Sequence, residues 1–124
     1  GGYSNQLWEY DPATKLWSQK SDYPGNGRRL ATAFTIGSKG YVGLGGNGSA
    51  RFNDFYEYDP NTDNWTQKAN FPGGNRYDAA SFAIGNYGYI GTGSCGGTCR
   101  LDTSEAADVR LMVRLSWRLI YTHK

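Results

Sequence analysis

The sequence repeats itself at a fixed spacing, and this repeat limits the choice of fold more than any other feature. When residues 7–46 are placed over residues 55–94 without a gap, 19 of the 40 aligned positions are identical. The identities include whole motifs, such as Glu-Tyr-Asp-Pro at 9–12 and again at 57–60. Such self-similarity is typical of repeat arrays, in which each unit buries its faces against neighbouring units.

One unit is predicted to hold four short antiparallel strands. Two runs separated by the glycine-containing turn 37–40 form the first pair, and two runs separated by the turn Asp59-Pro-Asn-Thr-Asp63 form the second. The predicted strands are Ala31–Ile36, Tyr41–Gly45, Asn53–Asp59 and Asn64–Lys68. Four such strands in one repeat unit predict one blade of a β-propeller, with the recurring Tyr and Trp packing between blades.

Composition and charge agree with an all-β protein and exclude several classes of function. The chain has 18 Gly, 10 Tyr, 5 Phe and 4 Trp, which suits tight turns and aromatic packing between sheets. Mean hydropathy is −0.67, and no apolar run approaches the ~20 residues that a membrane helix needs. Residues 1–94 carry eight basic and eight acidic side chains, so we expect no nucleic-acid partner and no membrane partner. The first residues resemble neither a signal peptide nor a native start, so we expect a chain cut at its front end.

The glycine-rich second strand, the Glu-Tyr-Asp-Pro motif and the Trp seven residues beyond its Tyr resemble kelch repeats. The motifs Trp-Thr-Gln-Lys, Phe-Pro-Gly and Gly-Tyr-Ile-Gly-Thr-Gly are similar to those of kelch arrays in secreted or surface bacterial proteins. Such arrays are often described as galactose-oxidase-like by fold. This resemblance covers residues 1–94 and implies part of a kelch-type β-propeller with about two four-stranded antiparallel blades. We expect third and fourth strands in residues 1–21, a full blade in 29–69 and two further strands in 77–94. The compartment stays open, and only the resemblance favours a secreted or surface protein.

Residues 95–124 share no register with the repeat and form a non-repeat tail. The tail contains both a helical arginine stripe and a strictly alternating apolar pattern, so it is predicted to be helical or disordered. The tail arose from a truncation, a frameshift or an artificial junction, or it is a genuine C-terminal helix packed on the last sheet, or a basic amphipathic membrane helix. Cys95 and Cys99, the only cysteines, form either a local disulfide or a free pair.

The sequence holds no set of residues for catalysis or for a cofactor. The single histidine is His123, so neither a Ser/His/Asp arrangement nor the copper site that the resemblance would imply can be assembled. The recurring carboxylates fall at turns and strands, where capping and solvation explain them. We therefore predict no enzyme activity, no metal and no cofactor in this chain.

What remains is a binding surface made of loops, because function usually lies on loops held by a rigid scaffold. The loops are expected in residues 24–29, 47–52 and 72–77, and the candidate binding residues are Arg28, Asn47, Arg51, Asn75, Arg76 and Tyr77. Arg28 and Arg76 repeat in register, so the alternative is that each ties one blade to the next.

The predicted function is a non-catalytic kelch-repeat module that recognises a protein or a glycan through propeller loops. The alternative is a fragment of a kelch-fold carbohydrate-active enzyme, an oxidase or a sugar epimerase, with its catalytic residues outside this chain. Because a partial propeller leaves blade edges exposed, we also expect association through these edges.

Overall fold

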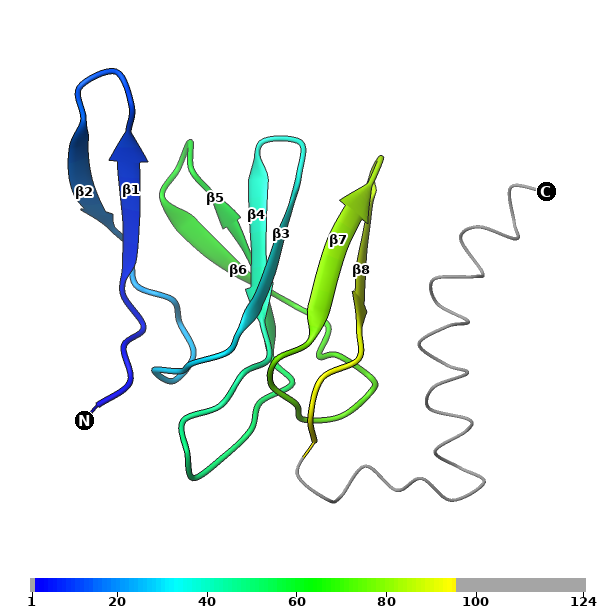
Figure 1. The fold of residues 1–124 in the computed structure, drawn as a ribbon. Helices are drawn as coiled ribbons and strands as arrows, with labels where there is room; N and C mark the ends of the chain where they lie inside the picture. Colours follow the sequence, from blue (N-terminus) through cyan, green and yellow to red (C-terminus); the bar gives the residue numbers. More distant parts are fainter. Residues whose placement is uncertain (1, 96–124) are drawn as a thin grey trace.

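The computed structural model of the 124-residue chain describes residues 2–95. These residues form eight β-strands and no helix, and all strand pairs are antiparallel (Figure 1). The strands are β1 (Leu7–Asp11), β2 (Leu16–Lys20), β3 (Thr32–Ile36), β4 (Lys39–Gly43), β5 (Phe55–Asp59), β6 (Asn64–Lys68), β7 (Ala80–Ile84) and β8 (Tyr87–Gly91). The all-β class predicted from the sequence is confirmed. All of the predicted tail beyond Cys95 lies outside the described residues.

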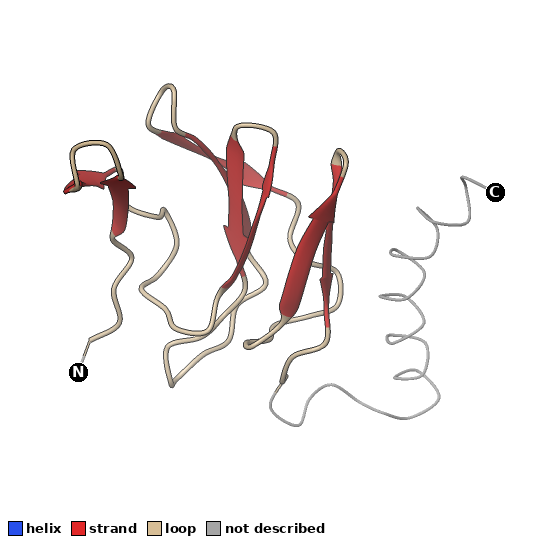
Figure 2. Ribbon diagram, turned by 45° about the horizontal axis from the view of Figure 1, so that its top comes forward, coloured by secondary structure: helices blue, strands red, loops and turns tan. Residues whose placement is uncertain are grey.

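The eight strands form three sheets that stand side by side (Figures 1 and 2). One sheet has four strands in the order β3-β4-β5-β6, and the flanking sheets are the hairpins β1–β2 and β7–β8. The alignment of the two sequence units places β1–β2 on β5–β6 and β3–β4 on β7–β8, with the same strand pairs. The repeat in the sequence is therefore also a repeat of strand pairing.

The second strand of each unit begins earlier than the sequence predicted, at Lys39 instead of Tyr41, because the hairpin turn is tighter. Ile36 pairs with Lys39, so the loop between β3 and β4 has only two residues. Gly37 is the first of these and has a φ of +58°, the conformation that a type II′ turn requires at that place. Lys39 and Gly40, the last two residues of the predicted four-residue turn, therefore belong to β4.

Left-handed backbone ends this second strand in both units. Leu44 and Gly45 have φ values of +60° and +87°, and Thr92 and Gly93 have +63° and +88°. The side chain of Leu44 is fully buried, and its amide donates to the Asp54 carbonyl oxygen at 3.1 Å. Burial and backbone pairing thus hold a non-glycine residue in a conformation that it seldom adopts. The strand predicted to reach Gly45 stops at Gly43 for this reason.

Neighbouring sheets contact each other where an aromatic ring meets a glycine. Phe34 on β3 stacks on Tyr41 of its own sheet, with ring centroids 5.2 Å apart. Gly88 on β8 of the next sheet lies so close to Phe34 that a Cβ atom there would overlap the ring. Ser81 Oγ also donates to the Ala33 carbonyl oxygen at 2.8 Å across the same junction. Glycine in β8 therefore has a packing reason, the close approach of an adjacent sheet.

The first hairpin is joined to the four-stranded sheet through a turn and a tryptophan. The Trp65 indole donates to the Ser21 carbonyl oxygen at 2.9 Å, and the Ser21 amide donates to Asp63 Oδ1 at 2.9 Å. The Tyr58 hydroxyl donates to the same carboxylate oxygen at 2.8 Å. Burial and this bond raise the pKa of Tyr58 to about 12. The sequence indicated only a turn role for Asp63, whereas it also connects two sheets.

A polar cluster around Glu57 joins three strands of the four-stranded sheet. The Tyr41 hydroxyl on β4 donates to Glu57 Oε2 at 2.7 Å, and Lys39 and Lys68 lie 3.2 and 3.4 Å from the carboxylate. The hydrogen bond from Tyr41 and the two ammonium groups hold the pKa of Glu57 below its usual range. Because Lys68 belongs to β6, the cluster supports the register of β4, β5 and β6 together.

Candidate functional site

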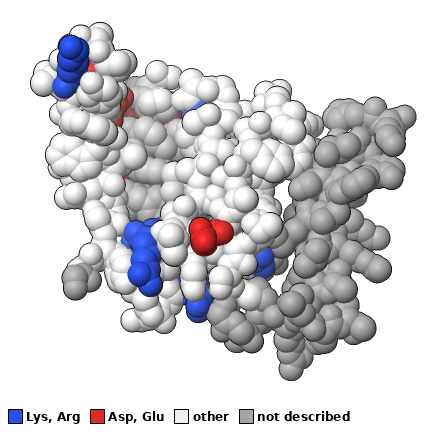
Figure 3. All heavy atoms as spheres, viewed as in Figure 1, with Lys and Arg blue, Asp and Glu red and all other residues white. Residues whose placement is uncertain are grey.

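The three long connections, β2–β3, β4–β5 and β6–β7, meet at one end of the sheets (Figure 1). Backbone bonds join them, with the Arg29 amide donating to Gly46 O at 2.8 Å and the Gly45 amide to Arg76 O at 2.8 Å. The Asp78 amide also donates to Leu30 O at 3.0 Å. Figure 3 shows basic side chains at this end, with an acidic side chain among them. The three connections are thus hydrogen-bonded to one another and form one continuous surface.

Arg28, a predicted binding residue, is built into this loop end. Its side chain is 5% exposed and makes a bidentate pair with Asp54, at 2.5 and 2.8 Å. It also donates to the Leu44 carbonyl oxygen at 2.8 Å, and its guanidinium lies 4.5 Å from the ring centroids of Tyr23 and Phe52. The guanidinium is therefore committed to holding the loops together.

Arg76 has the same place in the next unit and is also buried, at 5% exposure. It donates to the carbonyl oxygens of Thr92, at 3.0 Å, and of Gly73. Its guanidinium lies 5.1 Å from the ring of Phe71, which replaces the tyrosine found beside Arg28. Both in-register arginines thus lie beside an aromatic ring and donate to the carbonyl oxygen that follows the second strand of their unit, that of Leu44 or of Thr92.

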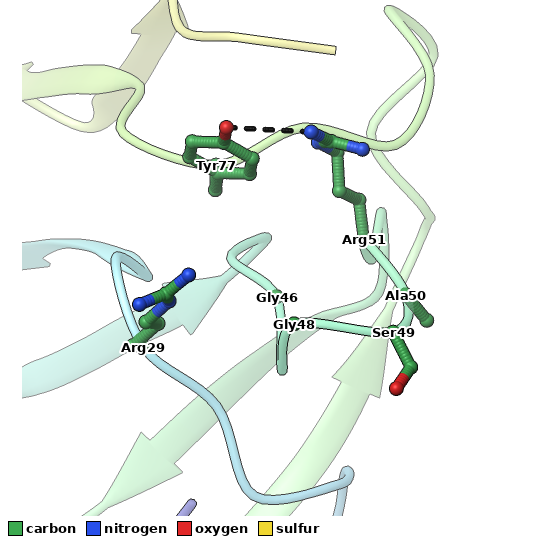
Figure 4. Close-up of a pocket in the computed structure, with 7 residues that line it drawn as sticks. All are labelled: Arg29, Gly46, Gly48, Ser49, Ala50, Arg51 and Tyr77. Carbon is green, nitrogen blue, oxygen red and sulfur yellow. Dashed lines mark hydrogen bonds between the residues drawn. The ribbon is translucent and has the colours of Figure 1, made fainter. Parts of the chain in front are cut away.

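A cavity of about 90 Å³ opens where the three connections meet (Figure 4). Its walls come from the β2–β3 connection, from the β4–β5 loop and from the β6–β7 connection, so it lies across the boundary between two repeat units. The lining residues are Arg29, Gly46, Gly48, Ser49, Ala50, Arg51 and Tyr77. Two of these are cationic and none is acidic, which makes the cavity a positively charged site.

Arg51 and Tyr77 form the polar pair of the cavity. Arg51 Nη2 lies 3.3 Å from the Tyr77 hydroxyl, and the guanidinium lies 4.6 Å from the centroid of the same ring (Figure 4). The hydrogen bond from Arg51 holds the pKa of the Tyr77 hydroxyl below its usual value. Arg51 Nε is buried without a partner among the described residues. The Arg51 guanidinium, packed on the Tyr77 ring, thus offers N–H donors to a ligand in the cavity.

The other two predicted site residues have different places. Asn47 fixes the β4–β5 loop, since its side-chain oxygen accepts the amides of Ser49 and Ala50 at 3.2 and 3.0 Å. It therefore shapes one wall of the cavity without lining it. Asn75 is exposed on the β6–β7 connection and is not part of the lining. Of the six predicted residues, the structure brings only Arg51 and Tyr77 together in the cavity.

Sequence reasoning missed Arg29. It follows Arg28 directly and aligns with Tyr77 of the next unit in the repeat. A positive charge at this position is therefore not shared by the two units. Its guanidinium lies 5.6 Å from the Tyr3 ring and the residue is exposed. The departure from the repeat was the available signal, because a residue that changes between units is free of the shared structural task.

Chemistry of other kinds was also sought within residues 2–95. No group of three or more His, Cys, Asp or Glu side chains in this range is placed to hold a metal ion. No helix long and apolar enough to cross a membrane occurs in the same range. Cys95 is disulfide-bonded, which decides between the two states that the sequence left open. The other cysteine of the chain, Cys99, lies outside the described residues.

Comparison with known proteins yields structural matches only. No family model matches the chain, and no curated protein matches it. A solved structure of YjhT matches with a TM-score of 0.63 at 21% sequence identity, and the match covers 87% of this chain. The chain spans 36% of the YjhT chain, so it corresponds to a little over a third of that longer protein. At this identity the likeness concerns the fold alone.

Proposed function

We propose that the chain is part of a kelch-type β-propeller. The support is a four-stranded antiparallel sheet whose halves recur with the sequence repeat and pack against their neighbours. Four-stranded antiparallel sheets arranged as adjacent units are what a propeller is made of. A chain as long as YjhT has room for about six such units, within the four to eight blades that propellers use.

The function of this fragment is non-catalytic binding of a protein or a glycan through the loop end. The observation that carries this proposal is the cavity formed by Arg29, Arg51 and Tyr77 between two units. The described residues that line it include no carboxylate, imidazole or thiol, the groups that most often act as general bases or nucleophiles. Two guanidinium groups and a hydroxyl without an acid instead suit recognition of an anion.

The group recognised is a carboxylate carried by a larger partner. Small-molecule sites have volumes of about 300–1,000 Å³, so a cavity of about 90 Å³ admits one small group and not a whole ligand. An arginine fork matches a carboxylate in geometry as well as in charge. The rest of the partner would then lie over the neighbouring loops.

Binding to immobilised glycans and peptides tests this proposal, with each acidic ligand paired to its neutral ester or amide. We expect the acidic member to bind more tightly, and binding to weaken as salt is added. Arg29→Ala and Arg51→Ala should each weaken it about 10-fold or more, because a hydrogen bond to a charged group contributes about 1.5–3 kcal/mol.

Lys15→Ala is the matched control, since Lys15 is an exposed cation in the β1–β2 turn, at the opposite end of the sheets. It removes one positive charge, as the arginine variants do, and should leave the affinity unchanged. Equal binding of acid and ester, or equal loss in all three variants, would contradict the proposal.

A further inference from the structure

Leu30 lies beside the cavity in a backbone conformation that leucine disfavours. Its φ is +56°, and the residue is 46% exposed. Leu44 has a similar φ of +60°, but its side chain is fully buried, and this burial holds the conformation. Leu30 has no such burial, and a bulky residue at positive φ is an outlier. Because Leu30 belongs to the β2–β3 connection, between two described sheets, its exposure does not come from an end of the described chain.

The next repeat unit keeps this backbone and changes the side chain. Asp78 aligns with Leu30 and has a φ of +59°. Asp and Asn adopt left-handed backbone more readily than other residues with a side chain, because their short polar groups can form local hydrogen bonds. One unit thus has a residue type that suits the backbone, whereas the other has an exposed leucine. A single exposed leucine is ordinary, but its combination with a positive φ indicates a task other than folding.

The backbone places Leu30 next to two walls of the cavity. Leu30 follows Arg29 directly, and its carbonyl oxygen accepts the amide of Asp78 at 3.0 Å. Asp78 in turn follows Tyr77. Since Arg29 and Tyr77 both line the cavity, an exposed apolar residue adjoins a positively charged site.

A second departure from the repeat brings both guanidinium groups to this cavity. The repeat aligns Tyr3 with Arg51, and it also aligns Arg29 with Tyr77. Arginine and tyrosine have therefore exchanged places between the units. The contact itself is kept, since the Arg29 guanidinium lies 5.6 Å from the Tyr3 ring and the Arg51 guanidinium lies 4.6 Å from the Tyr77 ring. Without the exchange, position 29 would be a tyrosine and the lining would have one cation instead of two.

We propose that the loop end binds the C-terminus of a protein chain whose last residue is apolar. The terminal carboxylate enters the cavity, and the side chain of the same residue packs against Leu30. A terminal residue carries both groups on one Cα atom, which matches the adjoining places of Arg29 and Leu30. This inference rests on the proposed carboxylate site and adds the apolar contact that selects the partner.

The size and the charge of the site favour a chain end over other carboxylates. A cavity of about 90 Å³ admits the carboxylate and little else. An acidic sugar surrounds its carboxylate with hydroxyl groups and offers no apolar side chain to Leu30. An acidic side chain within a peptide is separated from the next side chain by several more bonds than a terminal carboxylate is from its own. The exposed carboxylate of Asp78, next to Tyr77, also disfavours a partner with many acidic groups. Capture of a C-terminal carboxylate is an established mode of peptide recognition.

Fluorescence anisotropy of labelled peptides with the full 124-residue chain tests this inference. The first peptide is Gly-Ser-Gly-Ser-Leu with a free C-terminus, and the second is its C-terminal amide. The third ends in serine with a free C-terminus, and the fourth is an amidated peptide with an internal Asp-Leu pair. We expect the first to bind about 10-fold more tightly than each of the others, because only the first has both the charge-assisted hydrogen bonds and the buried leucine.

Leu30→Asn separates binding from folding. Asparagine suits the left-handed backbone and removes the apolar contact without adding a charge. The variant should bind the leucine-ended peptide about 10-fold more weakly, the ratio expected for losing the burial of one leucine side chain. It should bind the serine-ended peptide as the unaltered chain does, with the same or a higher midpoint of thermal unfolding.

Leu16→Asn is the matched control. Leu16 is an exposed leucine at the start of β2, beside the β1–β2 turn at the opposite end of the sheets. This variant makes the same change of side chain and should leave both affinities unchanged.

The outcomes distinguish this inference from the proposed function. Leucine-ended and serine-ended acids of equal affinity would overturn the inference and leave the carboxylate site standing. A loss of affinity for both peptides in Leu30→Asn would also overturn it, and so would tighter binding of the internal Asp-Leu peptide. Displacement of the peptide by octanoate or glucuronate at the affinity of the peptide itself would assign the site to another class of carboxylate and overturn the choice of a chain end. Equal binding of the free acid and its amide would overturn both proposals together.

Discussion

Asp54→Ala should lower the free energy of unfolding by about 3–5 kcal/mol, the cost of leaving a buried charge without its partner. Asp54 is the bidentate partner of Arg28, whose side chain is 5% exposed and whose guanidinium also holds the Leu44 carbonyl. Without the carboxylate, the positive charge of Arg28 stays buried between the rings of Tyr23 and Phe52 and has no negative charge paired with it in this contact. Since native domains have only about 5–15 kcal/mol of stability, this loss would remove a large share of that stability.

Urea unfolding followed by tryptophan fluorescence measures this effect. Glu9→Ala is the control, because it breaks the exposed pair with Lys20, and such pairs contribute less than about 1 kcal/mol. The double variant Arg28→Ala with Asp54→Ala should lose less than the sum of the two single variants, since neither charge is then left alone. Equal losses for Asp54→Ala and Glu9→Ala would contradict the structural role given to Arg28.

Gly88→Ala should destabilise the chain by about 1–3 kcal/mol, the range for overpacking. The added methyl group would overlap the ring of Phe34 on the adjacent sheet. Gly40 has the equivalent place one unit earlier, and nothing lies within 4 Å of a Cβ atom built there. Gly40→Ala should therefore change the stability by no more than about 0.5 kcal/mol.

Thermal unfolding of the two variants, followed by circular dichroism, makes the comparison. Both glycines are the second residue of their strand, where Gly40 pairs with Thr35 and Gly88 with Ala83 in the same kind of hairpin. Gly40 also pairs with Tyr58 of β5, but only Gly88 has a ring of the adjacent sheet against it. Phe34→Leu should recover part of the loss in Gly88→Ala, because a smaller side chain leaves room for the methyl group. Losses of the same size at both glycines would mean that adjacent sheets do not pack as described.

The sequence predicted the strands well because the repeat shows which positions share one structural task. Two copies of each motif in register distinguished the aromatic third strand and its Asp-Pro turn from chance patterns. The sequence could not predict where the second strand ends. Leucine is not a residue type that favours a left-handed φ. The conformation of Leu44 comes from the burial of its side chain and from its backbone hydrogen bond to Asp54, at the end of the β4–β5 connection.

The candidate site was predicted less well, for a related reason. Arg28 and Arg76 attracted attention because they repeat, and repetition marks what all units need for packing. Arg29 was missed because it stands at a position where the next unit has a tyrosine, and only the fold shows that both line one cavity. In a repeat array, the residues that depart from the repeat at the loop end are the better candidates for binding.

The central claim is that successive repeat units stand as adjacent sheets, with the Phe34 ring of the four-stranded sheet packed against Gly88 of the next sheet. A nuclear Overhauser spectrum of the chain, with Phe34 and Gly88 assigned, tests this claim most directly. We predict cross-peaks between the Phe34 ring protons and the Gly88 α-protons, in addition to those with Tyr41 in the same sheet. A Phe34 ring that shows cross-peaks only within its own sheet would contradict the claim.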